Sequence, residues 1–290
     1  MPVEVTDSQV NLTHPNGASV TALLYGATVI SWKSPSEGNT SDIKERLFVS
    51  TKAALDGSKP VRGGIPVCFP IFGPPSASHP EYAKLGQHGF ARNSTWKYLE
   101  TILDGDAGVS VRLGLTPTAA TDALAKFPWS LTYTVTLAGH QLTTDLVVKN
   151  TSSDTPFAFQ ALLHTYYAAP AASVAIGPLT GLTFIDKVQG GKERKEIRDL
   201  VDVRSFTDSV YKGASGHYSV RWDGGGADIR SVGFNDVVVW NPNQEAGSKI
   251  GDMNEGGWNN FVCVEPGTAS YFVDLEPGKE WRGQQVITAL

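Results

Sequence analysis

The feature of this sequence that most restricts its fold is the alternation of apolar and polar residues along 130–148. Residues 130–137 read Ser-Leu-Thr-Tyr-Thr-Val-Thr-Leu, so every second side chain is apolar or aromatic. A period of two places those side chains on one face of an extended strand. A short connection that contains Gly139 leads to 142–148, which is again rich in β-branched and apolar residues. The pattern predicts a long β-hairpin with one buried face.

Strand patterns recur through the chain, whereas helical patterns are weak. We predict further strands over 19–24, 28–32, 46–50, 109–115, 236–240, 261–264, 271–275 and 280–288, the last two as a closing pair around Pro277-Gly278. One short helix is expected over 118–127, with Thr118 or Thr121 as its N-cap. The run 192–196 mixes both charges and is expected to be a solvated loop.

This number of strands predicts an all-β protein. Each sheet has one apolar face to bury, so we expect two large, mainly antiparallel sheets packed face to face. No long linker or repeat interrupts the pattern. We therefore expect a single domain over 1–290.

The charge balance excludes several classes of partner. The chain carries 24 Lys and Arg against 29 Asp and Glu, a formal net charge of −5. Nucleic acids and anionic membranes are usually bound by clustered basic residues, so we expect neither as a partner.

The two cysteines, Cys68 and Cys263, are few for a disulfide-dependent protein. With no leader pattern and no apolar stretch of membrane-spanning length, the sequence predicts a cytoplasmic protein, which we expect to be a monomer.

The common cofactor motifs are missing from the sequence. It contains no C-x-x-C, no H-E-x-x-H, no phosphate-binding loop and no strand-linked G-x-G-x-x-G. A nucleophile elbow of the serine hydrolases is missing as well. We expect no bound metal and no cofactor.

Two segments place a cation beside glycine. Arg62 precedes Gly63-Gly64, and Gln87 and Arg92 flank a glycine at position 89. A guanidinium suits bidentate recognition of an oxyanion, and an amide can hold sugar hydroxyls. Ordinary tight turns explain both segments equally well, because glycine marks turns more often than sites.

His164 and Glu265 are the candidates for acid–base chemistry. His164 lies in the apolar run 161–167, and Glu265 ends an apolar strand at Pro266-Gly267. Taken alone, each has an ordinary explanation, as a hydrogen-bonded core histidine and as a turn acid. Asp186 and Asp208 could each accept hydrogen bonds from sugar hydroxyls, or from nearby backbone in a turn.

Five segments in the same order resemble the glucose-6-phosphate 1-epimerase (hexose-6-phosphate mutarotase) branch of the aldose 1-epimerase family. Beginning at residues 62, 87, 163, 239 and 263, they read Arg-Gly-Gly-Ile-Pro-x-Cys-Phe-Pro, Gln-His-Gly-Phe-Ala-Arg, Leu-His-Thr-Tyr-Tyr, Val-Trp-Asn-Pro and Cys-Val-Glu-Pro-Gly. The resemblance implies a galactose-mutarotase-like β-supersandwich with substrate in a cleft across one sheet. It also implies an isomerase that acts on a small-molecule hexose 6-phosphate, with glucose 6-phosphate as the favoured substrate.

The resemblance assigns roles to individual residues. It implies that His164 and Glu265 are catalytic and that Arg62, Gln87 and Arg92 bind substrate. The family's acidic-Asp-x-x-Tyr segment falls on Asp208, which is followed by Ser-Val-Tyr, although Phe-Thr precedes it here. We therefore prefer Asp208 to Asp186 as a substrate-binding residue. His88 is adjacent to the matched glutamine and is assigned no proton.

Anomer exchange needs only two proton transfers. One group takes the proton of the C1 hydroxyl while another gives a proton to the ring oxygen, and closure reverses both. With a reference pKa near 4.3, Glu265 is expected to be the base. His164 is expected to be the acid, because a nearby carboxylate favours imidazolium. Two rival functions stay open, an aldose 1-epimerase for unphosphorylated sugars and a non-catalytic carbohydrate-binding β-sandwich.

Overall fold

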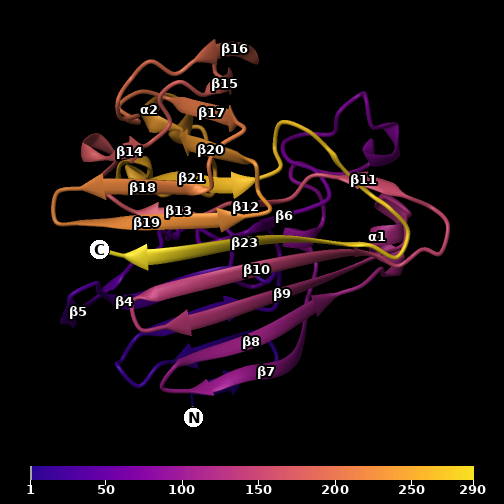
Figure 1. Ribbon diagram of the computed structural model, residues 1–290, viewed down its shortest axis with the longest axis horizontal. Helices are drawn as coiled ribbons and strands as arrows, with labels where there is room; N and C mark the ends of the chain where they lie inside the picture. The colour runs from indigo at the N-terminus through magenta and orange to yellow at the C-terminus, as the bar shows by residue number, and fades with distance from the viewer. Residues whose placement is uncertain (1) are drawn as a thin grey trace.

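The computed structural model describes residues 2–290, and its strands form two eight-stranded sheets, one five-stranded sheet and one two-stranded sheet. The first eight-stranded sheet, the long sheet, has the order β14 (Ala175–Gly177), β18 (His217–Trp222), β19 (Gly225–Val232), β23 (Glu280–Ala289), β10 (Gln141–Asn150), β9 (Trp129–Ala138), β8 (Gly108–Leu115) and β7 (Lys97–Gly105). Figure 1 shows it as one continuous twisted surface from β18 to β7.

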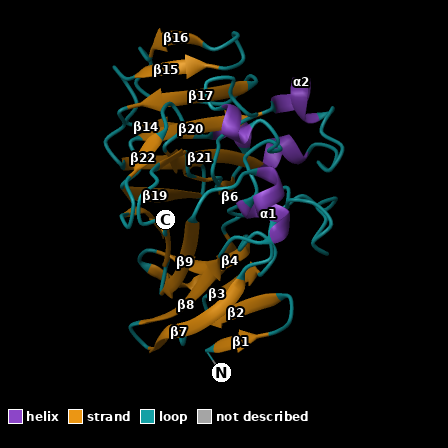
Figure 2. Ribbon diagram, turned by 90° about the vertical axis from the view of Figure 1, so that its right-hand side faces the viewer, coloured by secondary structure: helices purple, strands orange, loops and turns teal. Residues whose placement is uncertain are grey.

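The second eight-stranded sheet, the site sheet, carries the candidate functional residues. It runs β16 (Lys192–Lys195), β15 (Thr183–Asp186), β17 (Thr207–Lys212), β20 (Asp236–Asn241), β21 (Phe261–Gly267), β12 (Leu162–Leu163) and β6 (Val67–Cys68), with β13 (Tyr166–Ala168) also paired to β21. The site sheet occupies the upper half of the molecule in Figure 2.

The N-terminal sheet lies in the lower half of the same view, together with β7 to β9 of the long sheet. It is a meander of β1 (Val3–Val5), β2 (Gln9–Thr13), β3 (Ser19–Leu23), β4 (Val29–Ser36) and β5 (Asn39–Glu45). The two-stranded sheet pairs β11 (Phe157–Phe159) with β22 (Val273–Leu275). In the described residues, the strands of these sheets pair antiparallel, which confirms the predicted all-β class.

The helices are short, and Figure 2 shows them gathered on one side of the sheets. They are α1 (Ala119–Leu124), α2 (Asn243–Gly247) and the 3-10 turns Pro80–Tyr82, Ala91–Asn93, Ala171–Ser173 and Gly257–Asn260. Helix α1 falls inside the predicted 118–127. Thr118 is its N-cap and forms a capping box with Thr121, so both candidate residues take part in the cap. Within residues 2–290, no helix has the length and apolar character needed to cross a membrane.

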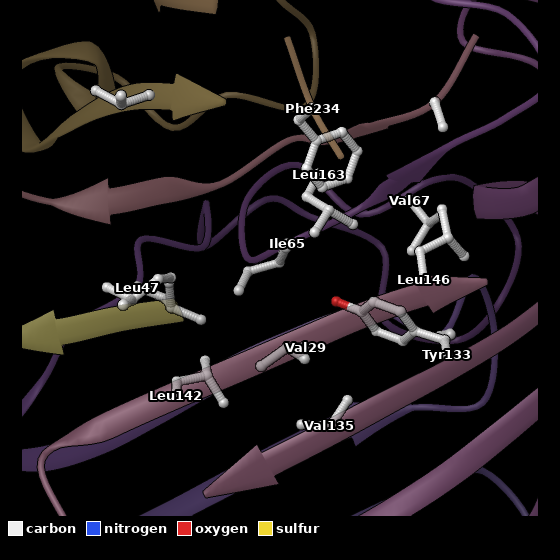
Figure 3. Close-up of a cluster of buried hydrophobic side chains, with 14 of the residues drawn as sticks. Val29, Leu47, Ile65, Val67, Tyr133, Val135, Leu142, Leu146, Leu163 and Phe234 are labelled. Atoms are coloured by element: carbon white, nitrogen blue, oxygen red, sulfur yellow. The ribbon is translucent and has the colours of Figure 1, made fainter. Parts of the chain in front are cut away.

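The hairpin predicted from the alternating pattern is confirmed. Strands β9 and β10 pair along their whole length, with Leu131 opposite Val148 and Tyr133 opposite Leu146. These four side chains are at most 1% exposed. Figure 3 shows Tyr133 and Leu146 turned toward the same buried cluster as residues from other segments, including Ile65. The apolar face of the long sheet is therefore the main wall of the core.

Strand β21 is buried on both faces, and this positions the site. Its residues Val262 and Val264 face the main core, whereas the alternate residues Cys263 and Glu265 face the opposite side. All seven residues of the strand are buried. A strand covered on both faces has an apolar sequence, which is why 261–264 contains no polar residue except the cysteine.

Three local expectations were wrong. The charged run 192–196 contains an exposed edge strand, β16, rather than a loop, because its four residues pair with β15. The segments 271–275 and 280–288 do not pair with each other: β22 joins β11, and β23 joins β10 and β19. The segment 46–50 makes only isolated bridges, at Leu47 and Val49.

Glycine in the two cation-containing segments is required by close backbone approach. Gly64 has φ +70°, and a Cβ there would lie 2.2 Å from the carbonyl oxygen of Val29. Gly89 has φ +71°, and a Cβ would lie 2.2 Å from the carbonyl oxygen of Phe69. Both contacts are with backbone, which cannot rotate away. The two glycines fix the path of the loops that carry Arg62 and Arg92.

We predict that Gly64→Ala destabilises the fold by roughly 2–4 kcal/mol, because it adds a steric clash to about 1–2 kcal/mol of left-handed backbone strain. Gly213→Ala is the matched control, since Gly213 has φ +61° but nothing within 4 Å of its Cβ position. The control should show the backbone strain alone. Urea unfolding of both variants measures the difference, and equal midpoints would contradict the close-approach explanation.

Candidate active site

One pocket collects the candidate residues from segments that lie far apart in the sequence. It encloses about 120 Å³ and is lined by Arg62, Phe72, Gln87, His88, Arg92, His164, Lys187, Asp208, Val238, Trp240 and Glu265. Every residue to which the sequence analysis gave a catalytic or substrate-binding role is in this lining. A larger hollow of about 750 Å³ lies over the outer face of β8 to β10 and β23, but it contains no pairing of histidine with carboxylate.

His164 and Glu265 form the centre of the pocket. The Nδ1 atom of His164 lies 3.3 Å from Oε2 of Glu265, and their side chains are 8% and 1% exposed. Neither atom has a well-directed hydrogen bond to any partner among residues 2–290. A buried polar atom without a hydrogen-bond partner costs free energy. Here an imidazole nitrogen and a carboxyl oxygen of this kind face each other in one pocket, which makes the pair the candidate for acid–base chemistry.

The strands explain how the pair is brought together. Glu265 belongs to β21, and His164 lies in the link between β12 and β13, both of which pair with β21. The backbone N–H of His164 donates to the carbonyl oxygen of Pro66 at 3.0 Å. The ring of Tyr166 stacks on the imidazole at a centroid distance of 4.7 Å, and Trp240 meets its edge at 5.8 Å. The imidazole is therefore held in one orientation.

Burial decides the charge of the pair in the free protein. Burial, with the nearby cations Arg92, Arg62 and Lys187, holds the pKa of His164 well below its usual value. Burial and the neighbouring Asp208 raise the pKa of Glu265 well above its usual value, against the opposing effect of Lys187. The sequence predicts imidazolium beside carboxylate. The pKa shifts of His164 and Glu265 both favour the neutral forms instead.

The correction has a simple physical reason. A carboxylate neighbour favours imidazolium in water, but in a desolvated pocket the charged forms of both groups lose hydration. A neutral imidazole beside a carboxylic acid holds the same single proton as imidazolium beside carboxylate. The pair therefore keeps one exchangeable proton, and burial changes only which atom carries it.

Arg62 is held in place by two contacts at the edge of the pair. Its Nε donates to Oδ1 of Asp252 at 3.0 Å, and its Nη1 donates to the hydroxyl of Tyr166 at 3.3 Å. The sequence gave no signal for Asp252, because a lone aspartate in a glycine-containing loop looks like a turn residue. Arg62 is thus an ordered cation rather than the freely moving surface arginine of a turn.

The loop from Gln87 to Arg92 supplies a second cation. The Arg92 guanidinium donates to the backbone carbonyl of Gln87 at 2.9 Å, while its buried Nε is without a partner in the described part of the chain. The backbone N–H of Gly73 donates to Nδ1 of His88 at 3.1 Å, which places the proton of neutral His88 on Nε2. Burial lowers the pKa of His88, so its ring is a neutral wall of the pocket.

Asp208 lies in the pocket and Asp186 does not line it. Asp208 faces Trp240 across β17 and β20, and its carboxylate is 3.6 Å from Nζ of Lys187. Asp186 instead accepts from the backbone N–H of Gln189 and pairs with Arg194, each at 3.1 Å. Burial raises the pKa of Asp208, and Lys187 opposes that shift.

Lys187 is the residue that the sequence analysis missed. Its ammonium lies 4.6 Å from the centroid of the Phe72 ring and completes a set of three cations around the pocket with Arg62 and Arg92. Lys187 follows directly after β15, whose end also carries the aspartate that we had considered. The position of Lys187 directly after this strand is the sequence signal that could have identified it.

Comparison with known proteins places the chain in a family. A family model described as aldose 1-epimerase matches residues 8–288. A relative from Escherichia coli (strain K12), named provisionally as a glucose-6-phosphate 1-epimerase, is 34% identical over 85% of this chain and 79% of its own length. A similarly named relative from Cenchrus ciliaris is 28% identical over 92% of this chain and 80% of its own. The chain belongs to the aldose 1-epimerase family.

Solved structures support the fold. A provisionally named mutarotase from Salmonella typhimurium has a TM-score of 0.85 at 27% identity, covering 99% of this chain and 92% of that one. The galactose 1-epimerase from Lactobacillus acidophilus has a TM-score of 0.74 at 14% identity, covering 100% and 97%. The fold is thus galactose-mutarotase-like, as the sequence motifs implied.

We predict that His164 is neutral in the free protein at pH 6, where a histidine of ordinary pKa near 6.5 is mostly protonated. Its pKa is held low, so the ring binds a proton only at more acidic pH. Long-range ¹H–¹⁵N spectra of labelled protein distinguish the neutral ring from imidazolium. Glu265→Gln should leave the ring neutral. An imidazolium pattern at pH 6 in the wild type, lost in Glu265→Gln, would show that the ion pair prevails instead.

Proposed function

We propose that this protein interconverts the α and β anomers of hexose 6-phosphates, and that glucose 6-phosphate is the substrate to test first. The observation that carries the proposal is the presence of an acid–base pair and three cations in one pocket. The pair, His164 and Glu265, suits opening and closing of a hemiacetal. The cations suit an oxyanion that an unphosphorylated sugar lacks.

The single proton of the pair is sufficient for ring opening. Glu265 takes the proton of the C1 hydroxyl, and His164 gives its proton to the ring oxygen. The open-chain aldehyde rotates about the bond between C1 and C2, and the reversed transfers close the ring as the other anomer. One proton enters the pair and one leaves it in each direction, so the protein returns to its starting state without a cofactor.

The phosphate of the substrate prepares the pair for this step. In the free protein, Arg92, Arg62 and Lys187 all lower the pKa of His164. A bound phosphate dianion balances these positive charges and so favours the proton on the imidazole rather than on the carboxyl. The chemical step is then coupled to recognition of the phosphate.

The remaining pocket residues suit the sugar ring. Gln87 supplies an amide and Asp208 a carboxylate, both able to bond hydroxyl groups of a hexose. Trp240 and Phe72 supply flat apolar surface in the same lining. We assign Arg62, Arg92 and Lys187 to the phosphate, with Gln87 and Asp208 on the sugar hydroxyls.

We predict that Glu265→Gln and His164→Asn each lower the rate of anomer exchange by roughly 10²- to 10⁴-fold, because each removes a positioned proton-transfer group. Exchange between α- and β-glucose 6-phosphate is measured by NMR magnetisation transfer. Asp186→Asn, a buried carboxylate outside the pocket lining, is the matched control and should keep normal exchange. Near-normal exchange in a folded Glu265→Gln or His164→Asn variant would contradict the proposed pair.

We predict that Lys187→Met raises the KM for glucose 6-phosphate by about 10- to 100-fold, which corresponds to roughly 1.5–3 kcal/mol for one charge-assisted contact. Activity on free glucose should change little. Lys33→Met, at an exposed lysine of β4, is the control and should leave both substrates unaffected. If the wild-type protein handled glucose and glucose 6-phosphate equally well, the assignment of the cations to phosphate would be wrong.

A further inference from the structure

Cys263 places a thiol within 4.8 Å of the acid–base pair. A ring nitrogen of His164, Sγ of Cys263 and a carboxylate oxygen of Glu265 all lie within 4.8 Å of one another, and all three residues are buried. Cys263 and Glu265 are two positions apart on β21, so the strand points both side chains to the same face. The reaction proposed above uses the nitrogen and the oxygen but leaves the sulfur without a role.

Two of these three atoms are buried and unpartnered. Nδ1 of His164 and Oε2 of Glu265 have no well-directed hydrogen bond within residues 2–290, although both side chains are more than nine-tenths buried. Both atoms are available to a ligand that brings positive charge. The surrounding rings of Tyr166, Trp240 and Phe261 fix the position of the cluster.

The donor set and its spacing match a thiophilic metal ion. Zn²⁺ takes imidazole nitrogen and carboxylate oxygen at about 2.0–2.2 Å and thiolate sulfur at about 2.3 Å in tetrahedral geometry. Donors of a tetrahedral site are then about 3.3–3.6 Å apart, and His164 Nδ1 and Glu265 Oε2 are 3.3 Å apart. Sγ of Cys263 lies within 4.8 Å of both atoms, and the proposed site requires the thiol to turn toward them.

We propose that His164, Cys263 and Glu265 form a binding site for a thiophilic divalent cation of the Zn²⁺ class, and that the bound ion inhibits the protein. Binding releases two protons to solvent, the thiol proton of Cys263 and the proton shared by His164 and Glu265, with no redox change. The ion occupies the nitrogen and oxygen that carry protons in the reaction. The inhibitory part rests on the proposed function, whereas the binding part does not.

The charges of the pocket determine the strength and selectivity of the site. Arg62, Arg92 and Lys187 oppose any approaching cation, but Asp252 and Asp208 partly balance two of them. The repulsion weakens the binding of every divalent ion, and the donor atoms determine which ion is preferred. Mg²⁺ and Ca²⁺ prefer all-oxygen sites, whereas a thiolate favours ions of the Zn²⁺ class. A bound sugar phosphate and the ion exclude each other, because both need His164 and Glu265.

The two cysteines of the chain provide a matched pair of variants. Cys68 and Cys263 are both fully buried, but only Cys263 lies within the cluster. Cobalt(II) is the direct probe, because a thiolate–cobalt bond gives a charge-transfer band in the near ultraviolet. Zinc is the functional probe, titrated against glucose 6-phosphate exchange with Mg²⁺ as the comparison ion.

We expect Cys263→Ala to keep anomer exchange, to lose the cobalt band, and to need at least about tenfold more zinc for half-inhibition, since metal sites commonly lose 10- to 100-fold in affinity even from lesser changes. Cys68→Ala should keep both the band and the zinc sensitivity. Cys263→Val, which retains apolar packing in the strand, replaces the alanine variant if that variant does not fold.

A cobalt band or zinc sensitivity that survives in the Cys263 variants, or that disappears equally in Cys68→Ala, overturns the site. Inhibition by Mg²⁺ at the same concentrations overturns its selectivity. If the wild-type protein showed no anomer exchange, the proposed function would fail, while the cobalt band would still report on the metal site. The two proposals are therefore tested separately.

Discussion

The burial of Glu265 is the constraint on which the rest of the site depends. Glu265 is 1% exposed and lacks a full set of hydrogen bonds. It needs, first, neighbours that cover it from water and, second, neighbours that hold His164 in place. Strand β21 meets the first need by lying inside the site sheet with both faces covered. The stacked rings around His164 meet the second. The apolar core and the polar site therefore lie on opposite faces of the same strand.

That arrangement explains why the loops matter as much as the sheets. The loops of Arg62 and Arg92 line the same pocket as Glu265 of β21. Close backbone contacts of Gly64 with Val29 and of Gly89 with Phe69 fix the paths of these loops. Any side chain at those glycines would displace the loop and move a cation with it. Backbone geometry thus sets the paths of the two loops, and side-chain contacts then orient the cations.

The sequence was sufficient where an alternating pattern marks a strand with one buried face, and insufficient for an exposed edge strand and for pairing between distant segments. The hairpin of β9 and β10 could be predicted because its period of two has one physical solution, a strand with one buried face. The run 192–196 was misjudged because charge indicates exposure, and an exposed edge strand meets that condition as well as a loop does. The pairing of β22 with β11 could not be predicted, since proline and glycine at 277–278 suggested a local hairpin and the true partner is distant in sequence.

The site shows the same division. His164, Glu265, Arg62, Gln87, Arg92 and Asp208 were identified as an ordered set of motifs, and the pocket contains all of them. Lys187 and Asp252 were missed because each contributes one charge from a segment without a motif. The charge state of the pair was also misjudged, because the extent of burial is a property of the folded chain and not of the local sequence.

The contacts that hold Arg62 also affect the free energy of binding a ligand. An arginine on a free surface loses rotational freedom when it grips an anion, a loss of about 0.5–1.5 kcal/mol for each ordered side chain. Arg62 has already lost that freedom to Asp252 and Tyr166. An arriving anion then meets a rigid partner, so discrimination between ligands rests on shape and charge spacing rather than on induced ordering.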